Sequence, residues 1–462
     1  MDRERKKRLQ TIRLAITETI MVISVVALVI ILTFVAMGYG LNKDGEVGQS
    51  GLLQIRSVPT GAIVEIDNEI ISAKTNTSKM LPAGEHKIKL SKSGYDTWEK
   101  TVLSESGWLL KLDYPRLFLT DRSAERVREY TSDISFFAPS PSHEYIVYSV
   151  ASSDDWTLLN VSNSNDVTET TLKTSEILEK RTILSLTWNK NSDKILVQTK
   201  NNDSTEWIII NINDVNKSIN LSKTFGMNFS ELKFASDNGE RLIALENGNL
   251  RTVMASDRTI SQILASDIES FTQDEKHIVY ITRGHEVKLF QEGSDDIRLA
   301  NYQPEQKVNV AFGEYLSRSY IAISVDKMVY YYRGNLPTKD DDLDSMELAL
   351  KKELAFIPDW ISTDARSEFY IAKSGNNLAV YDAELNKLSE YSIESDSYFF
   401  LDDYLIANID NDKMIVRDFD GANRRELTDA TGAGFIARDS KTLFFIKSDR
   451  GNSSIMREKI SE

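Results

Sequence analysis

Histidines and carboxylates are the side chains of this chain that could transfer protons or bind a metal ion. The chain has four histidines, His86, His143, His277 and His285, and none is paired with another in a metal-binding motif. No second histidine follows His285-Glu286 four residues on, so the metalloprotease motif H-E-x-x-H is missing. A metal site would have to be assembled from distant parts of the chain. We therefore predict no metal site and no cofactor.

Carboxylates gather at two places in the second half of the chain. Asp340, Asp341, Asp342 and Asp344 could bind a divalent cation weakly, but a solvated charge run is the better interpretation. The segment Asp418-Phe419-Asp420-Gly421 has its glycine at the wrong offset for a calcium loop, and no glutamate follows at the required position. We predict a tight hairpin turn there.

Compact motifs for nucleophilic catalysis and phosphate binding are also missing from the sequence. There is no G-x-S-x-G elbow, no G-x-x-x-x-G-K-[ST] loop and no cysteine. A chain without cysteine has no thiol nucleophile, no zinc–thiolate site and no disulfide. Exported proteins that do without disulfides are more typical of bacteria. We predict a bacterial protein that is not an enzyme and has no catalytic residues.

Charge is distributed very unevenly along the 462 residues. The net charge is -15, yet residues 1–13 hold six basic and two acidic side chains, which leaves -19 for the remainder. An acidic body repels phosphates, whereas the short basic tail can attract anionic lipid headgroups. We therefore predict no nucleic-acid partner.

A run of 18 residues from Ile20 to Met37 is apolar apart from Ser24 and Thr33. Its length suits the hydrocarbon core of a bilayer, and the basic residues on its N-terminal side place that end in the cytoplasm. A cleaved signal peptide is the alternative, with Ala36 and Gly38 at the cleavage site. We predict an uncleaved anchor, because signal sequences usually have shorter apolar runs.

Short β-rich runs alternate with turn residues between positions 51 and 114. The turns contain Pro59-Thr60-Gly61-Ala62, Pro82-Ala83-Gly84-Glu85-His86 and Lys92-Ser93-Gly94-Tyr95. This order of turns resembles the PEGA family, although Thr60 replaces a glutamate and Thr75-Asn76-Thr77 replaces a Thr-Pro pair. The resemblance implies a small β-sandwich that acts in cell-surface association or protein interaction.

Three side chains of this module could form a carbohydrate-binding set, namely His86, Trp98 and Trp108. Aromatic residues of a domain this small usually pack in its core. We expect core packing here.

An aromatic residue followed by a polar turn and a strand recurs through the rest of the chain. The aromatic positions are Phe137, Trp188, Phe234, Phe271, Phe312, Trp360, Phe400 and Phe435, about 43 residues apart on average. Units of this length with several short strands indicate the blades of a β-propeller. The opening Phe137-Ala138-Pro139-Ser140-Pro141 and the hairpin at Asp418 resemble the TolB-like and PD40 type of propeller.

The number of blades and two local features follow less directly from the repeat. Seven or eight blades fit the spacing; we prefer eight, with Arg116 to Thr120 as the strand that closes the ring. Asp340 to Leu354 contains good helix formers and Glu347 to Lys351 at i,i+4, so we predict a short surface helix.

The sequence thus predicts a mainly β protein with one transmembrane helix, a PEGA-like sandwich and a propeller of seven or eight blades. The boundaries are a cytoplasmic basic tail at 1–18, the transmembrane helix at 19–41, a linker at 42–50, the PEGA-like domain at 51–114 and the propeller at 115–462. We expect a single-pass membrane protein with an outward-facing body. Its expected partners are the lipid bilayer and a cell-envelope polymer or surface protein, which it binds as a scaffold. Two alternatives stay open: a propeller-type hydrolase or lyase that acts on an envelope polymer, and a structural protein without a specific ligand.

Overall fold

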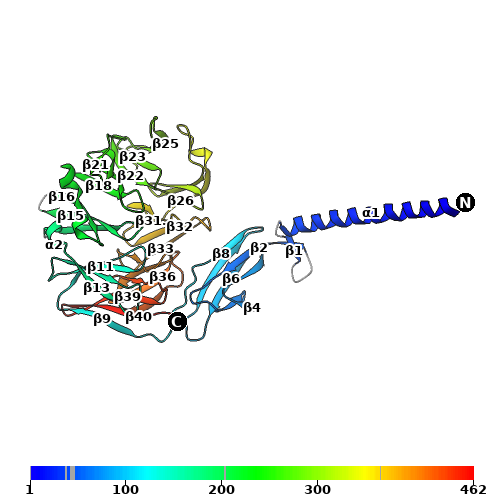
Figure 1. Cartoon of the computed structure of the whole chain (residues 1–462), viewed down its shortest axis with the longest axis horizontal. Helices are drawn as coiled ribbons and strands as arrows, with labels where there is room; N and C mark the ends of the chain where they lie inside the picture. Colours follow the sequence, from blue (N-terminus) through cyan, green and yellow to red (C-terminus); the bar gives the residue numbers. More distant parts are fainter. Residues whose placement is uncertain (1, 37–38, 42–46, 180, 202–203, 365) are drawn as a thin grey trace. The chain divides into compact units, whose positions relative to one another are not determined.

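The computed structural model describes residues 2–36, 39–41, 47–179, 181–201, 204–364 and 366–462 (Figure 1). The chain folds into two compact units. The first holds Met1–Asp121 together with Ser461–Glu462, and the second holds Arg122–Ile460.

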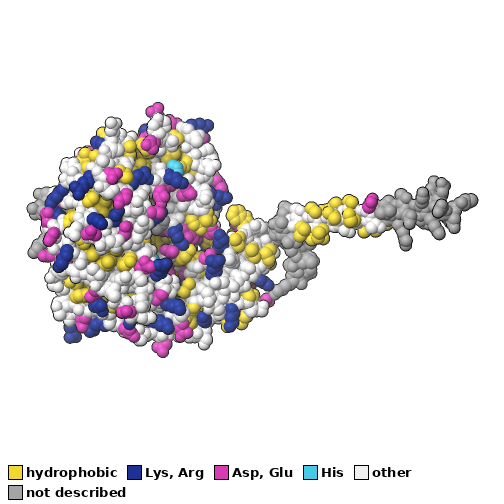
Figure 2. Space-filling model, in the orientation of Figure 1, with side chains coloured by type: hydrophobic (Ala, Val, Ile, Leu, Met, Phe, Trp, Pro, Cys, Tyr) yellow, Lys and Arg dark blue, Asp and Glu magenta, His cyan; other side chains and the backbone are white. Residues whose placement is uncertain are grey.

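The first unit begins with the helix α1 (Asp2–Ala36). Within it, the 19-residue segment Ile16–Phe34 has a mean hydropathy of 2.5, and none of it is buried inside the protein. Figure 2 shows its hydrophobic side chains on the surface of the helix. At about 1.5 Å rise per residue the segment is about as long as a bilayer core is thick. A membrane anchor has these properties, and a signal sequence shares them.

The predicted boundaries at 41 and 50 differ from the structure. The helix ends at Ala36, and β1 (Tyr39–Leu41) pairs antiparallel with β2 (Val47–Ile55), with Tyr39 opposite Gln49. A pair of β-strands therefore replaces the end of the predicted helix and part of the predicted linker. Gly38 and Gly40 give a reason, because glycine is a poor helix former. Residues 37–38 and 42–46 lie outside the described residues.

Two four-stranded sheets make up the sandwich of the first unit. One sheet contains β1, β2, β5 (Thr77–Pro82) and β8 (Leu109–Leu112). The other has the order β4 (Glu69–Lys74), β3 (Ile63–Ile66), β6 (Gly84–Ser91), β7 (Trp98–Ser104). Alternate side chains of both sheets point inward, as the period-2 pattern predicted, and the buried set includes Leu53, Val64, Ile88, Trp98 and Leu112.

Turn residues of this module have the conformations that the sequence implied. Gly61 and Gly94 adopt φ values of 81° and 80°, a region that glycine occupies without strain. Thr75, which begins the segment that replaces the usual Thr-Pro pair of the PEGA family, fits into this turn. Its hydroxyl accepts a hydrogen bond from the Ala62 amide at 2.9 Å, and its carbonyl accepts one from the Gly61 amide at 2.7 Å. These contacts hold the first turn in place.

The described residues of the second unit contain eight four-stranded antiparallel sheets, here called blades 1 to 8 in chain order. The strands of blades 1 to 4 are β10 (Ile134–Pro139), β11 (Tyr145–Val150), β12 (Trp156–Asn160), β13 (Thr168–Leu172); β14 (Thr182–Trp188), β15 (Lys194–Asn201), β16 (Ser204–Asn211), β17 (Ile219–Asn220); β18 (Phe229–Phe234), β19 (Arg241–Glu246), β20 (Asn249–Met254), β21 (Thr259–Ile260); β22 (Ile268–Gln273), β23 (Ile278–Thr282), β24 (Glu286–Leu289) and β25 (Ile297–Asn301).

The strands of blades 5 to 8 are β26 (Val308–Tyr315), β27 (Arg318–Val325), β28 (Met328–Gly334), β29 (Glu347–Glu353); β30 (Trp360–Thr363), β31 (Phe369–Ser374), β32 (Asn377–Asp382), β33 (Lys387–Ser392); β34 (Phe399–Phe400), β35 (Leu405–Asp410), β36 (Lys413–Asp418), β37 (Arg425–Asp429); β38 (Gly434–Ile436), β39 (Thr442–Asp449), β40 (Asn452–Lys459) and β9 (Ala124–Tyr130). Short helices between strands are α2 (Ser175–Leu178), η1 (Val215–Lys217), α3 (Leu221–Phe225) and η2 (Leu343–Ser345).

Blade 8 closes the ring with a strand from the start of the second unit. β9 pairs with β40 (Figure 1). In this pairing Arg128 lies opposite Ile455. The predicted closing segment, Arg116 to Thr120, was wrong: Arg116 bridges Val58 inside the first unit. Its neighbour Leu117 is fully buried there, so these residues serve the core of the first unit. The preferred count of eight blades is confirmed.

The eight aromatic positions of the repeat all lie in the first strand of a blade. These strands are β10, β14, β18, β22, β26, β30, β34 and β38. First strands of successive blades contact one another, as for β22 with β26, β26 with β30 and β10 with β38. They therefore line the centre of the ring.

Blades are held together by apolar side chains between neighbouring sheets. Every residue of β23 is buried, and its Val279 and Ile281 belong to one core cluster with Phe312, Ile321 and Ile323 of blade 5. A strand that is apolar on both faces suits a sheet covered on both sides.

The helix predicted for Asp340 to Leu354 was wrong. The segment contains only the 3₁₀ turn η2, and Glu347–Glu353 form β29, which pairs with β28. Arg333 donates two hydrogen bonds to the Glu347 carboxylate, at 2.8 and 2.6 Å. The ladder to β28 outweighs the helix propensity of these residues, because a blade needs a fourth strand to complete its sheet.

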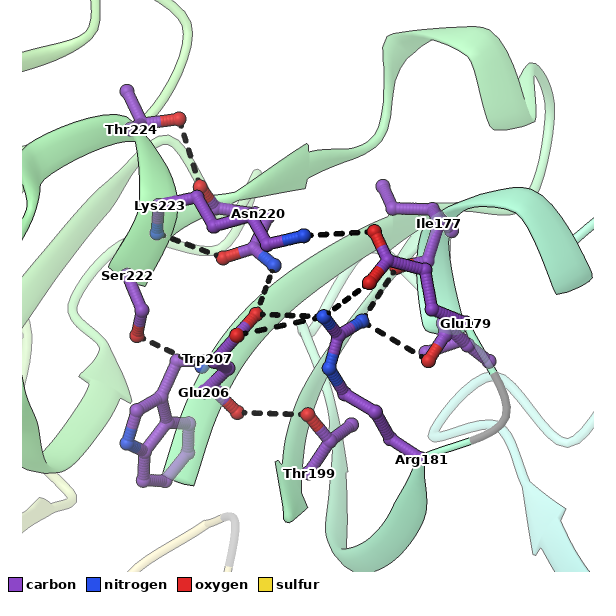
Figure 3. Close-up of polar contacts among 11 residues, drawn as sticks. Ile177, Glu179, Arg181, Thr199, Glu206, Trp207, Asn220, Ser222, Lys223 and Thr224 are labelled. Atoms are coloured by element: carbon purple, nitrogen blue, oxygen red, sulfur yellow. Dashed lines mark hydrogen bonds and ion pairs between the residues drawn. The ribbon is translucent and has the colours of Figure 1, made fainter. Parts of the chain in front are cut away.

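A buried arginine joins the segment between blades 1 and 2 to β16 of blade 2 (Figure 3). Arg181 lies between α2 and β14, and its side chain is 1% exposed. It donates to the carbonyls of Ile177 and Leu178 at 3.2 and 3.0 Å and to the carboxylate of Glu179 at 2.6 Å. Its guanidinium also lies 3.3 Å from a carboxylate oxygen of Glu206 on β16. These contacts compensate a buried charge and hold the segment after α2 against blade 2, which is a structural role.

Candidate functional site

The second unit contains a cavity of about 740 Å³ that touches five blades. Its lining comes from the C-terminal ends of first strands and from the turns that follow them: Thr187 to Lys190, Leu232 to Asp237, Gln273 to Lys276, Phe312 and Glu314, and Thr363, Asp364, Arg366 and Ser367. Because the first strands line the centre of the ring, this cavity is one mouth of the central channel.

Charged side chains from three blades form a network on one side of the cavity. Lys190 Nζ lies 2.9 Å from Asp237 Oδ1 and 3.1 Å from Glu275 Oε1. The hydrogen bond from Lys190 holds the pKa of Asp237 below its ordinary value. Asp237 is therefore ionised at neutral pH and unsuited to donate a proton.

Side chains of the cavity wall also join neighbouring first strands. Lys233 donates to the carbonyl of Phe271 at 2.6 Å and lies 4.4 Å from the centre of the Phe271 ring. Gln273 donates to the carbonyl of Phe234 at 2.9 Å, and Trp188 donates to that of Ala138 at 3.3 Å. The wall is therefore held in a defined shape before any ligand binds.

The wall formed by blade 6 contains a cluster of acids around Arg366. Asp364 accepts hydrogen bonds from the amides of Phe369 and Arg366 at 2.8 and 3.2 Å. Arg366 forms an ion pair with Glu368 at 3.0 Å and donates to the Tyr404 hydroxyl at 2.9 Å. Burial raises the pKa of Asp364, and burial together with nearby carboxylates raises the pKa of Glu368 to about 7.

The close packing of blades 5 and 6 at this wall depends on a glycine. A methyl group at Gly313 would overlap the side chain of Ser367, which lines the cavity. Gly313 lies between Phe312 and Glu314, which are also lining residues. Because Gly313 has no side chain, the turn after β30 can pack directly against β26.

The four histidines do not converge in the structure. His143 bonds to the carbonyl of Ile436 and so links blades 1 and 8, while His277 lies 3.3 Å from Asp274 in the same turn. His285 has a φ of 61° in the turn before β24, and His86 belongs to the first unit. Among the described residues, no group of three His, Asp or Glu side chains could hold a metal ion.

The two carboxylate runs have structural partners. Asp340 accepts a hydrogen bond from the Arg298 amide at 2.8 Å, and the Asp341 carboxylate accepts two from the Arg298 guanidinium, at 3.0 and 2.6 Å. Gly421 lies in the turn between β36 and β37 with a φ of 83°, as the predicted hairpin requires. Both runs serve the fold.

The channel-mouth residues were not singled out from the sequence. Lys190, Gln273 and Glu314 each follow the repeated aromatic residue by two positions, and Asp364 follows Trp360 by four. Their place within four residues of the repeated aromatic residue is a signal that could have found them, since the ends of the first strands in a repeat converge on one face of the ring.

The sandwich of the first unit has the strands and turns described above, in the order that the sequence implied. Residues 50–115 match the PEGA domain. The match covers about a seventh of the chain, so it describes this domain alone. The PEGA domain and the propeller suggest a binding or scaffold role.

The three side chains considered as a carbohydrate set differ in exposure in the PEGA domain. Trp98 is fully buried, as expected, and packs edge-on against Tyr114 with ring centres 6.0 Å apart. His86 lies 2.6 Å from a carboxylate oxygen of Asp67. Trp108 is 59% exposed, so the expectation of core packing was wrong for this residue.

Two solved structures are similar to the chain at a low level. The β-propeller domain of Cps50 (Swd1) from Myceliophteria thermophila is 9% identical, with a TM-score of 0.40, covering 72% of this chain and 99% of that one. A chain in the mitotic checkpoint complex is 10% identical, with a TM-score of 0.37, covering 72% and 94%. The eight-bladed assignment therefore depends on the strand pairing and not on these neighbours. No curated protein matches the chain.

Proposed function

We propose that this protein is a membrane-anchored binding protein whose propeller captures a cell-envelope polymer or a surface protein at the channel mouth. The observation that carries the proposal is the cavity itself, which is built by turns from five blades. It combines aromatic side chains with charged groups of both signs, among them Phe234, Phe312, Lys276 and Glu275. Such a surface suits a polar ligand with several hydrogen-bonding groups.

The anchor and its orientation are part of the proposal. Residues 1–13 hold six basic side chains, whereas Lys43 is the only basic residue close behind the apolar segment. The positive-inside rule then puts the N-terminus in the cytoplasm, and the PEGA domain and the propeller outside. Protease treatment of intact cells should release propeller peptides. Release only after lysis would contradict this orientation.

Binding at the channel mouth is tested by reversing one exposed charge. Lys276→Glu changes the cavity lining, and Lys327→Glu makes the same change in the exposed turn between β27 and β28, at the other end of the strands. The full chain in detergent is immobilised and exposed to envelope glycan fragments and to peptides from surface proteins, and mass spectrometry follows retention. Lys276→Glu should reduce retention and Lys327→Glu should not. Equal retention by both variants would contradict the proposed site.

A propeller hydrolase is the second candidate, because Glu368 has a pKa of about 7 beside the cavity wall. A carboxylic acid with that pKa can act as a general acid at neutral pH. Its ion pair with Arg366 and its burial favour a structural role. Retained ligand should therefore stay unchanged. Product release that disappears in Glu368→Gln would establish the hydrolase instead.

A further inference from the structure

Exposed hydrophobic side chains are concentrated on the PEGA domain. Outside α1, thirteen large hydrophobic residues among the described residues are exposed, and seven of them lie between positions 50 and 115. Single exposed hydrophobic residues are ordinary, whereas a group of them on one part of a domain indicates an interaction surface.

Five of these seven side chains lie at one end of the domain, here called the apolar end. They are between 38% and 59% exposed: Leu52, Met80, Leu103, Trp108 and Leu109. Leu52 lies directly opposite Met80 of β5 on one side and opposite Leu109 of β8 on the other. These three therefore form one row across the outer face of the sheet.

Strand registers place Trp108 and Leu103 at the same end. The Leu52 amide donates to the Trp108 carbonyl at 2.9 Å, and the Gly107 amide donates to the Ser50 carbonyl at 3.0 Å. Leu103 is the last but one residue of β7, just before the loop that leads to β8, and it lies opposite Glu85 near the start of β6. The loop between β7 and β8 therefore carries exposed hydrophobic residues on both of its sides.

The apolar end is also the end of the domain that is connected to the apolar helix. Ser50 follows Gln49, which is paired with Tyr39, and Tyr39 is only three residues from the end of α1. Leu52 lies three residues after Gln49 in β2, which is about 10 Å at the spacing of residues in a strand. An extended path from Ala36 to Leu52 through this pairing measures at most about 25 Å.

A bilayer offers a suitable environment for this end. The segment Ile16–Phe34 matches the hydrocarbon thickness, so Ala36 would lie at the headgroup level with the PEGA domain next to it. Tryptophan and leucine side chains favour that interfacial layer. Two acidic residues belong to this end: Glu85 lies opposite Leu103, and Glu105 follows two residues after Leu103. Their negative charges repel anionic headgroups, so apolar contact is the driving force that remains.

We propose that the apolar end of the PEGA domain inserts into the outer interface of the membrane that holds α1, as a second, peripheral membrane contact. The inference rests on the proposed anchor. It assigns to the PEGA domain a lipid-facing surface, so that the domain is held against the bilayer as well as tethered to it. A second copy of the chain or a protein partner on the same side chains is the competing outcome.

The absence of cysteine allows one fluorescent label to be placed at a single position of the full chain. Leu109→Cys labels the apolar end. Ser93→Cys labels an exposed position in the turn after β6, at the opposite end of that strand, about 23 Å away over its length. Val26→Cys labels the apolar helix. Each variant carries an environment-sensitive dye and is placed in nanodiscs of zwitterionic phosphatidylcholine, with or without lipids that carry a quencher on the acyl chain.

We expect quenching at residue 26, quenching at residue 109 at least about twofold stronger than at residue 93, and no dependence of either on salt. Quenching at 26 without quenching at 109 would overturn the lipid-facing surface and leave the anchor intact. Absence of quenching at 26 would overturn the anchor, and the inference with it. A blue-shifted dye at 109 that the lipid quencher does not reach would assign this end to a protein contact. Trp108→Ser in the Leu109→Cys chain should reduce quenching at 109, and unchanged circular dichroism would show that the fold is kept.

Discussion

Replacing Arg181 with methionine removes a buried charge while keeping most of the side-chain volume. The substitution deletes the two bonds to the carbonyls of Ile177 and Leu178 and the contacts with Glu179 and Glu206. Glu179 can regain water because its side chain is 49% exposed and it retains Lys223 at 2.7 Å. Glu206 cannot do so easily, because its side chain is only 15% exposed.

The expected cost follows from what stays behind in the protein. Removing one member of a buried ion pair destabilises a protein by about 3–5 kcal/mol, because the other charge stays buried without a partner. Asn220 still donates a hydrogen bond to Glu206, and the carbonyls of Ile177 and Leu178 can bind water instead of Arg181. We therefore expect the free energy of unfolding to fall by the lower limit of this range, about 3 kcal/mol. The double variant Arg181→Met, Glu206→Gln should recover about 1–2 kcal/mol, since no uncompensated charge remains.

Urea unfolding, followed by tryptophan fluorescence, measures these differences in a fragment that begins at residue 47. Trp207 reports on the same region, because it follows Glu206 in β16 and its backbone amide donates a hydrogen bond to the Ser222 hydroxyl at 3.0 Å. The matched control is Lys223→Met, which removes an exposed partner of Glu179 and should cost less than about 1 kcal/mol. If Arg181→Met costs no more than that control, the reasoning that this buried charge holds the segment between blades 1 and 2 against β16 is refuted.

Three further predictions concern the cavity wall and the folded units. Gly313→Ala should lower the free energy of unfolding by about 1–3 kcal/mol, because the new methyl group overlaps Ser367. Adding Ser367→Gly should restore part of this loss, and equal urea midpoints for Gly313→Ala and the wild type would contradict the prediction. Glu368 has a higher pKa in the folded than in the unfolded chain, so its protonation stabilises the fold fully below about pH 4.5, and this contribution is lost as the pH rises through about 7. Glu368→Gln should remove that loss, which is at most about 3 kcal/mol at 1.36 kcal/mol per pKa unit, whereas identical pH profiles of wild type and variant would argue against a buried acid. The fragment from residue 47 should be soluble with a mainly β circular dichroism spectrum, and a dominant helical spectrum would contradict independent folding.

Local patterns were enough to predict the elements that depend on local interactions. The apolar run after Ile20 forms a helix because a helix satisfies its own backbone, whatever surrounds it. The turns at Gly61 and Gly94 follow from the backbone freedom of single residues. The repeated aromatic residues marked the first strand of every blade, because each repeat builds one blade from the same succession of strands.

Predictions failed where a distant strand decides the outcome. Glu347 to Lys351 has the spacing of a helical ion pair, yet the segment is a strand because β28 offers it a hydrogen-bond ladder. Arg116 to Thr120 has the apolar pattern of a closing strand but belongs to the first unit. Its position in the sequence did not distinguish it from β9.

The sequence by itself determined the apolar helix, the turns of the PEGA domain and the period of the blades, because each of these depends on residues within about one repeat of one another. The closure of the ring pairs Arg128 with Ile455, more than three hundred residues apart, and only the tertiary structure decided it. The same holds for the channel mouth. Lys190, Asp237 and Glu275 are unremarkable in three separate repeats, and they form one charged network because the ring brings the ends of its first strands together.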